Sequence, residues 1–167
     1  RLPEGTSAID GVEAGTIDAV ILLQNVSKIL NSREIRPLLG HHQEDEMAYY
    51  QKTKIFPGMH TVVIKKEILE RSPWVANSLM KAYQESKDAC YNLRSKLAEF
   101  GGSSIVWMYD NIKEQSEFFG EDPYQFGVGP NKNMLDTLAG YLFREGMISK
   151  KPDIGSLFVK STTAIYA

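Results

Sequence analysis

The longest periodic stretch of the sequence runs from Trp74 to Phe100 and most constrains the fold. Its apolar residues recur three, four or seven positions apart, the spacing that gathers them on one face of an α-helix. They are Val75, Leu79, Ala82, Tyr83, Cys90, Leu93 and Leu97. Ser72 is the expected N-cap, Pro73 the first helical residue and Gly101-Gly102 the terminator. Such a helix must bury its apolar face, so the chain should fold in packed layers.

Two apolar runs are expected to be strands. Ile17 to Leu23 is apolar almost throughout, as is typical of a strand covered on both faces. Met59 to Ile64 ends in the β-branched run Thr61-Val62-Val63-Ile64. We also expect helices over residues 7–14, 44–52, 67–70, 103–121 and 132–145, the last with Asn131 as its cap.

These elements predict an α/β fold with few strands covered by helices. Two strands do not form a sheet large enough to cover three long helices. Either further strands are present that the pattern does not reveal, or part of the sheet lies outside this chain.

Composition and charge exclude several classes of function. Lys and Arg total 19 against 21 Asp and Glu, so the basic excess of a nucleic-acid-binding protein is missing. The longest apolar run, Ala19 to Leu23, is far shorter than the roughly 20 residues of a membrane helix. A single cysteine, Cys90, cannot form an intrachain disulfide. We therefore predict no nucleic acid and no membrane span.

A cluster of metal-binding residue types lies at His41 to Glu46. His42 and Glu46 are four positions apart, so a helix would direct both to one side. The alternative is a solvated, acidic helix start. Because no third ligand follows at a recognised spacing, we predict no metal site.

His60 is the best candidate for a general acid or base. It stands at the expected junction of a loop and a strand, where α/β proteins collect ligands, and an imidazole suits proton transfer near neutral pH. The alternative is a structural histidine whose ring bonds to the backbone.

The loop from Gly120 to Pro130 is the second candidate site. Its glycines leave backbone amides accessible, and a helix is expected to begin at Asn131, which together suit an anion. Tyr124 and Phe126 offer rings for stacking on an aromatic ligand. The alternative is a structural loop between helices.

Several segments together resemble the 4,5-dihydroxyphthalate decarboxylase family. The similarity covers nearly the whole chain and rests on the order and spacing of its segments. They are Gly15-Thr16-Ile17-Asp18-Ala19, Phe56–Ile64, Ser72–Ala76, Gly120–Tyr124, Phe126-Gly127, Pro130-Asn131, Tyr141-Leu142, Glu145–Met147 and Leu157-Phe158.

This resemblance implies a type II periplasmic-binding-protein-like fold with two lobes. Such proteins are about twice as long as these 167 residues, so the chain resembles a C-terminal half without its N-terminal half. Residues 1–55 would form the end of the second lobe and the crossover, and residues 56–167 the return to the first lobe with C-terminal helices.

The loop departs from the family pattern at two positions. Where the family often has Asp-Pro-Trp-Pro-Tyr-Gly, this chain has Tyr124 in place of the Trp and Phe126 in place of the Tyr. The second change removes a hydroxyl, which alters specificity if that hydroxyl touches the ligand. The family's Pro-Ile-Met-His becomes Pro57-Gly58-Met59-His60, which keeps the histidine.

The function implied by the resemblance is decarboxylation of a hydroxylated aromatic dicarboxylate, without a cofactor. His60 would be the acid, and Tyr124 or Phe126 would stack on the ring. The amides of Gly127 to Asn131, with Lys132, would hold a carboxylate. The alternative is a solute-binding protein that delivers a small anionic or aromatic ligand to an ABC-type transporter.

The expected partner is a small aromatic carboxylate. The exposed sheet edges of a half-chain would also favour a homo-oligomer. We expect a cytoplasmic protein, or a periplasmic one if an export signal lies in the N-terminal part.

Overall fold

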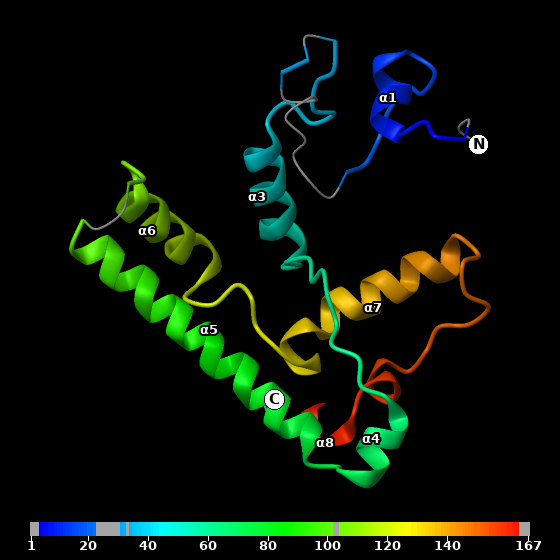
Figure 1. Ribbon diagram of the computed structural model, residues 1–167, viewed down its shortest axis with the longest axis vertical. Helices are drawn as coiled ribbons and strands as arrows, with labels where there is room; N and C mark the ends of the chain where they lie inside the picture. Colours follow the sequence, from blue (N-terminus) through cyan, green and yellow to red (C-terminus); the bar gives the residue numbers. More distant parts are fainter. Residues whose placement is uncertain (1–3, 23–30, 33, 102–103, 164–167) are drawn as a thin grey trace. The chain divides into compact units, whose positions relative to one another are not determined.

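The computed structural model describes residues 4–22, 31–32, 34–101 and 104–163. The chain divides into two compact units, Arg1–Lys52 and Thr53–Ala167. Within the described ranges every regular element is a helix, and none is a strand (Figure 1).

The described residues of the first unit include the helices α1 (Ala8–Glu13) and α3 (His42–Thr53), and α3 ends at the boundary of the units. A capping box starts α1: the Ser7 hydroxyl accepts the Asp10 amide at 3.1 Å, and the Asp10 carboxylate accepts the Ser7 amide at 3.2 Å. The first turn of α3 is acidic and its last turn carries Lys52, which suits the helix dipole.

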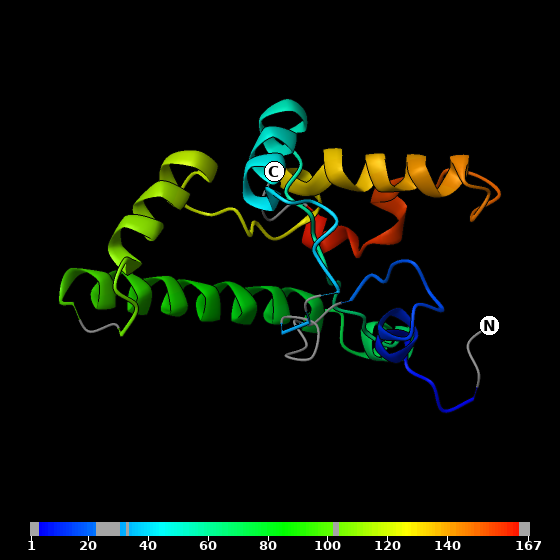
Figure 2. The same cartoon turned by 90° about the horizontal axis from the view of Figure 1, so that it is seen from above.

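The second unit contains the longer helices. They are α4 (Lys66–Arg71), α5 (Val75–Glu99), α6 (Met108–Phe119), α7 (Val128–Arg144), the 3₁₀ helix η1 (Ile154–Leu157) and α8 (Lys160–Thr163). Helices α4, α6 and α8 each contact α5 (Figures 1 and 2). Helix α7 packs against η1. No described helix is long and apolar enough to cross a membrane.

The hydrophobic core of the second unit is small. Its buried hydrophobic residues, within the part of the chain that is described, are Ile55, Ala76, Ala139 and Ile154. Large side chains such as Val63 and Trp107 are exposed instead. Because so little apolar surface is buried, the positions of the loops depend more on polar contacts between distant segments.

An extended segment from Ile55 to Gly58 runs past the start of α7 (Figure 1). The Phe56 ring makes edge-to-face contacts with Phe119 and Tyr124, at centroid distances of 5.4 and 5.0 Å. A Cβ atom on Gly58 would lie only 2.8 Å from Cε of Met134, so this position needs glycine unless Met134 moves. The segment is therefore anchored both to α7 and to the loop that precedes it.

The expectation of an α/β, periplasmic-binding-protein-like fold is wrong for the residues described. Residues 17–22 form turns, bends and irregular chain, and Leu23 lies outside the described residues. Residues 59–64 are extended but make no backbone hydrogen bond within the described ranges. A β-branched run favours extended backbone, but a strand exists only where a second segment supplies its donors and acceptors. Neither run has such a neighbour among the residues that the structure describes.

Each predicted helix is present, but several begin or end at other residues than expected. Helix α5 begins at Val75 with Trp74 at the N-cap, so the cap expected at Ser72 is wrong. Helix α7 begins at Val128, three residues before the expected cap. Asn131 instead lies in its first turn and bonds back to the loop. Ser, Pro and Asn near a helix start occur in several turn geometries, so their presence does not define the first helical residue.

Candidate functional site

Asp122 is the centre of a polar cluster that joins α5 to the loop between α6 and α7. Its Oδ2 accepts a hydrogen bond from Nζ of Lys87 at 2.5 Å. Its Oδ1 accepts the Tyr91 hydroxyl at 2.9 Å and the backbone amide of Tyr124 at 3.0 Å. Lys87 and Tyr91 are one turn apart on α5, so a single face of that helix supplies both side-chain donors.

Lys87 is held from three directions. Besides Asp122, its ammonium group donates to the Tyr124 carbonyl at 3.0 Å and lies 4.2 Å from the centroid of the Phe126 ring. Its side chain is only 9% exposed, against 29% for Asp122. A lysine buried to this degree requires a counter-charge, and Asp122 supplies it.

The phenol of Tyr91 is strongly perturbed. Burial, together with the hydrogen bond that it donates to Asp122, raises the pKa of Tyr91 from 10.0 to about 12. The guanidinium of Arg94 lies 4.6 Å from the centroid of the same ring. Tyr91 therefore stays protonated at neutral pH and acts as a fixed hydrogen-bond donor to the carboxylate.

Gly127 and Asn131 shape the end of the loop. Gly127, the N-cap of α7, has φ of 95° and ψ of 172°, a conformation open almost only to glycine. The side-chain amide of Asn131 donates to the carbonyls of Gln125 and Gly127, both at 2.8 Å. These bonds fold the loop back onto the first turn of α7.

A pocket of about 670 Å³ opens where α5, this loop and the first turn of α7 meet. Its lining residues are Gln84, Lys87, Asp122, Gln125, Phe126, Gly129 and Pro130. We call it the loop pocket. It combines an ion pair, two side-chain amides and an aromatic ring with the start of a helix.

The chemistry of the loop pocket suits a ring that carries polar groups. Side-chain amides such as Gln84 and Gln125 donate and accept hydrogen bonds, and the N-terminal turn of α7 favours negative charge. Lys87 already occupies one face of the Phe126 ring. The Tyr83 ring also contacts it, with centroids 6.4 Å apart and planes at 76°. An aromatic ligand would therefore meet the part of the Phe126 ring that Lys87 and Tyr83 leave uncovered.

The structure brings only some of the predicted site residues to this pocket. Phe126 lines it, and Gly127 and Asn131 hold the loop that forms it. The Tyr124 backbone belongs to the Asp122 cluster, whereas its half-exposed ring packs against Phe56. Lys132 points elsewhere and pairs with Asp136, one turn along α7.

His60 lies apart from the cluster. It is exposed on the segment after Gly58 and is not among the residues that line the loop pocket. It is four positions beyond Phe56, which touches the Tyr124 ring, so its Cα lies at most about 14 Å from that of Phe56. Its catalytic role stays a prediction.

Sequence reasoning missed the residues that organise the site. Lys87 and Tyr91 lie 35 and 31 positions before Asp122, and no local motif links them to it. One signal was present: a lysine and a tyrosine four residues apart interrupt the apolar face of the long helix. Polar groups on such a face call for a buried partner, and Asp122 is that partner.

No group of three or more His, Cys, Asp or Glu able to hold a metal ion occurs among the described residues. His41 and His42 are exposed at the start of α3, beside the acidic first turn of that helix. The residues from His41 to Glu46 are all exposed.

Comparison with known proteins gives a distant similarity to a decarboxylase, and no family model matches the sequence. The relative is 4,5-dihydroxyphthalate decarboxylase of Comamonas testosteroni, 23% identical over 170 residues. The alignment covers 95% of this chain and 51% of the relative, so the chain spans about half of its length.

Proposed function

We propose that this chain belongs to a decarboxylase of a hydroxylated aromatic dicarboxylate and that the loop pocket binds the substrate ring. The observation that carries the proposal is the loop pocket itself, with its aromatic ring, side-chain amides and helix start. The distant similarity to 4,5-dihydroxyphthalate decarboxylase across 95% of the chain supports the same chemistry.

In the proposed reaction the imidazolium of His60 protonates the ring carbon that bears the departing carboxylate. The bond between that carbon and the carboxylate then breaks, carbon dioxide leaves, and the electron pair restores the aromatic ring. The backbone amides of Gly127, Val128 and Gly129, at the start of α7, would hold the remaining carboxylate. Lys132, expected from the sequence to assist, pairs with Asp136 instead. The Phe126 ring would pack against the substrate, and Tyr124 would contribute at the rim.

Binding is the first test because it does not require turnover. We would titrate the chain with 4,5-dihydroxyphthalate and follow the backbone amides of Gln125, Phe126 and Gly129 by NMR. Saturable shifts confined to these amides, weakened about tenfold in Phe126→Ala, are expected because that substitution removes the ring. A Phe118→Ala control removes a ring from outside the pocket lining and should keep the affinity. Shifts scattered over the chain, or equal loss in both variants, would reject the loop pocket as the site.

Turnover is the second test. The longest available form of the protein is incubated with 4,5-dihydroxyphthalate, and 3,4-dihydroxybenzoate is sought by chromatography. If His60 is the acid, His60→Ala should abolish product formation while sparing affinity. Equal loss of affinity and rate would give His60 a binding role instead. If the ligand binds but no form of the protein gives product, the proposed function becomes solute binding. The described residues give that alternative no separate support. The cytoplasmic compartment and the homo-oligomer stay predictions from the sequence.

A further inference from the structure

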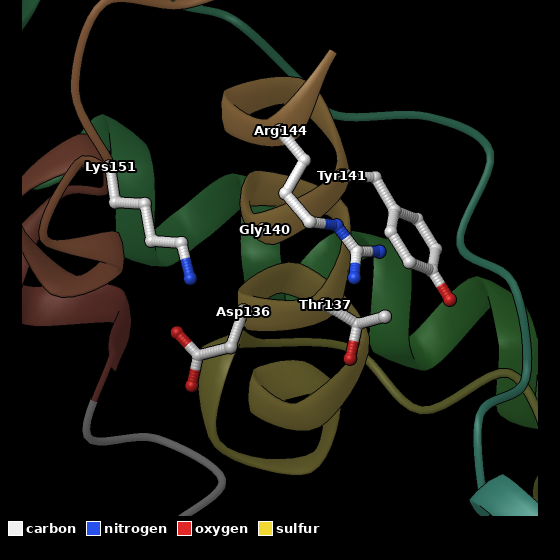
Figure 3. A pocket seen from close by; sticks show the side chains of 6 residues that line it. All are labelled: Asp136, Thr137, Gly140, Tyr141, Arg144 and Lys151. Carbon is white, nitrogen blue, oxygen red and sulfur yellow. The ribbon is translucent and has the colours of Figure 1, made fainter.

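A second pocket, on α7, contains two cations that form no ion pair within the described part of the chain. It has a volume of about 300 Å³ and is lined by Asp136, Thr137, Gly140, Tyr141, Arg144 and Lys151. Figure 3 shows the side chains of Arg144 and Lys151 approaching Gly140 from two sides. We call it the α7 pocket.

The charges of this pocket do not cancel. Asp136, its one acidic residue, already pairs with Lys132. Neither Arg144 nor Lys151 makes an ion pair with any residue in the described part of the chain. The pocket therefore keeps two positive charges in a protein whose formal net charge is -2.

Both cations are placed by contacts other than ion pairs. The guanidinium of Arg144 lies 4.9 Å from the centroid of the Tyr141 ring, a cation–π geometry. Lys151 comes from the chain beyond α7, and its Nζ lies 3.6 Å from where a Cβ on Gly140 would stand. The absence of a side chain at Gly140 thus leaves space between the two cations.

Arg144 has a simpler possible role as the basic residue at the end of α7. A basic residue in the last turn compensates the partial negative charge of the carbonyl end, and Arg144 is in that position on α7. Lys151 is not part of the helix, and it reaches back over Gly140, a full turn before the end. Dipole compensation by Arg144 leaves the placement of Lys151 unexplained.

We propose that the α7 pocket binds a small oxyanion, the carboxylate or phosphate group of a metabolite, between Arg144 and Lys151. A guanidinium offers a planar pair of donors that matches either group, and an ammonium adds a point charge. The hydroxyl of Thr137, on the same face of α7, lies within the lining and offers a neutral donor.

The test is a titration of the full chain with two probes, inorganic phosphate and phthalate, each at constant ionic strength. Binding is followed by NMR through the backbone amides of Thr137 and Tyr141. Saturable shifts of these amides with at least one probe are expected, and the probe that binds more tightly identifies the source of the oxyanion. Shifts that grow linearly with both probes would overturn the proposal.

Three variants and a control separate a local site from general attraction to a basic surface. Arg144→Gln and Lys151→Gln should each weaken binding about tenfold. Gly140→Leu keeps both charges but fills the space between them, so it should abolish the shifts at Thr137. Lys113→Gln removes an exposed lysine on α6 that pairs with Glu117, and it should change affinity less than about twofold. Equal weakening in Lys113→Gln, or undiminished binding in Gly140→Leu, would overturn the proposal.

Far-UV circular dichroism of each variant confirms that α7 is intact before its affinity is interpreted. Lys151→Arg, which keeps the charge, should retain binding within about threefold; a loss as large as that of Lys151→Gln would contradict an electrostatic role. The amides of Gln125 and Gly129 report on the loop pocket in the same spectra. A loss of shifts at Gln125 and Gly129 would therefore count against the proposed function, and a loss at Thr137 and Tyr141 against this inference.

Discussion

The two pockets of the second unit use their charges in opposite ways. In the loop pocket Lys87 and Asp122 are largely buried and satisfy each other. In the α7 pocket Arg144 and Lys151 are exposed and have no ion-pair partner among the described residues. Charges that are buried and paired stabilise the fold, because removing one leaves the other buried without a counter-charge. Charges that are exposed and unpaired cost little to keep and are free to meet a ligand. We therefore expect the Lys87–Asp122 pair to determine stability, and Arg144 and Lys151 to determine the binding of an oxyanion.

The largest effect is expected for Asp122→Asn. The substitution keeps the shape of the side chain but leaves Lys87, whose side chain is 9% exposed, without a counter-charge. We expect the free energy of unfolding to fall by about 2 kcal/mol, below the range for fully buried pairs because Asp122 is partly exposed. Urea denaturation followed by circular dichroism measures it.

The matched control is Asp136→Asn on α7. This carboxylate pairs with Lys132 on an exposed helix surface, so its loss should cost less than about 0.5 kcal/mol. Equal losses in the two variants would remove the contrast between buried and exposed charge on which the comparison rests.

The next effect concerns the backbone that shapes the loop pocket. Gly127→Ala places a Cβ on a residue with φ of 95°, and we expect a loss of about 1 to 2 kcal/mol from backbone strain. Gly140→Ala is the control on the same helix. It should stabilise α7 by about 0.5 kcal/mol, because alanine is the better helix former and its Cβ would meet only ordinary contacts. Effects of the same sign would show that strain at Gly127 does not hold the loop.

Tyr91 gives a test that depends on pH. Its pKa is raised from 10.0 to about 12 in the folded chain, so the folded state holds this proton more tightly than the unfolded state. The resulting stabilisation is complete below about pH 10 and is lost as the pH rises towards about 12. Unfolding of wild type and Tyr91→Phe, compared between pH 8 and pH 12, isolates this contribution because the variant lacks the phenol.

At neutral pH Tyr91→Phe should itself cost about 1 kcal/mol, because one bond to the Asp122 carboxylate is lost. The exposed Tyr109 supplies the control, since Tyr109→Phe should preserve the wild-type pH profile. A Tyr91→Phe profile that falls with pH as steeply as that of wild type would disprove a raised pKa at Tyr91.

The comparison also shows what could be predicted from the sequence. The long helix was predicted because its apolar spacing is local information, and α5 occupies Val75–Glu99. The residues that surround Phe126 could not be predicted in this way. Lys87 and Asp122 are brought together only by the course of the helix and loop between them. Strands were predicted at two apolar runs because residue preference for extended backbone is local, whereas the pairing that makes a strand is not. Arg144 and Lys151 form no sequence motif, because only the fold brings Lys151 next to Gly140 on α7.

The smallest effect is expected at the α7 pocket and is the most informative about the comparison. Arg144→Gln and Lys151→Gln should each change the free energy of unfolding by less than about 0.5 kcal/mol, because neither cation holds a buried anion. The Arg144–Tyr141 contact is exposed and accounts for most of any change. Urea denaturation of the two single variants and of the double variant measures it, and the two changes should add within about 0.5 kcal/mol. A loss near that of Asp122→Asn would mean that these cations hold structure as Lys87 does, and the distinction between the two pockets would fail.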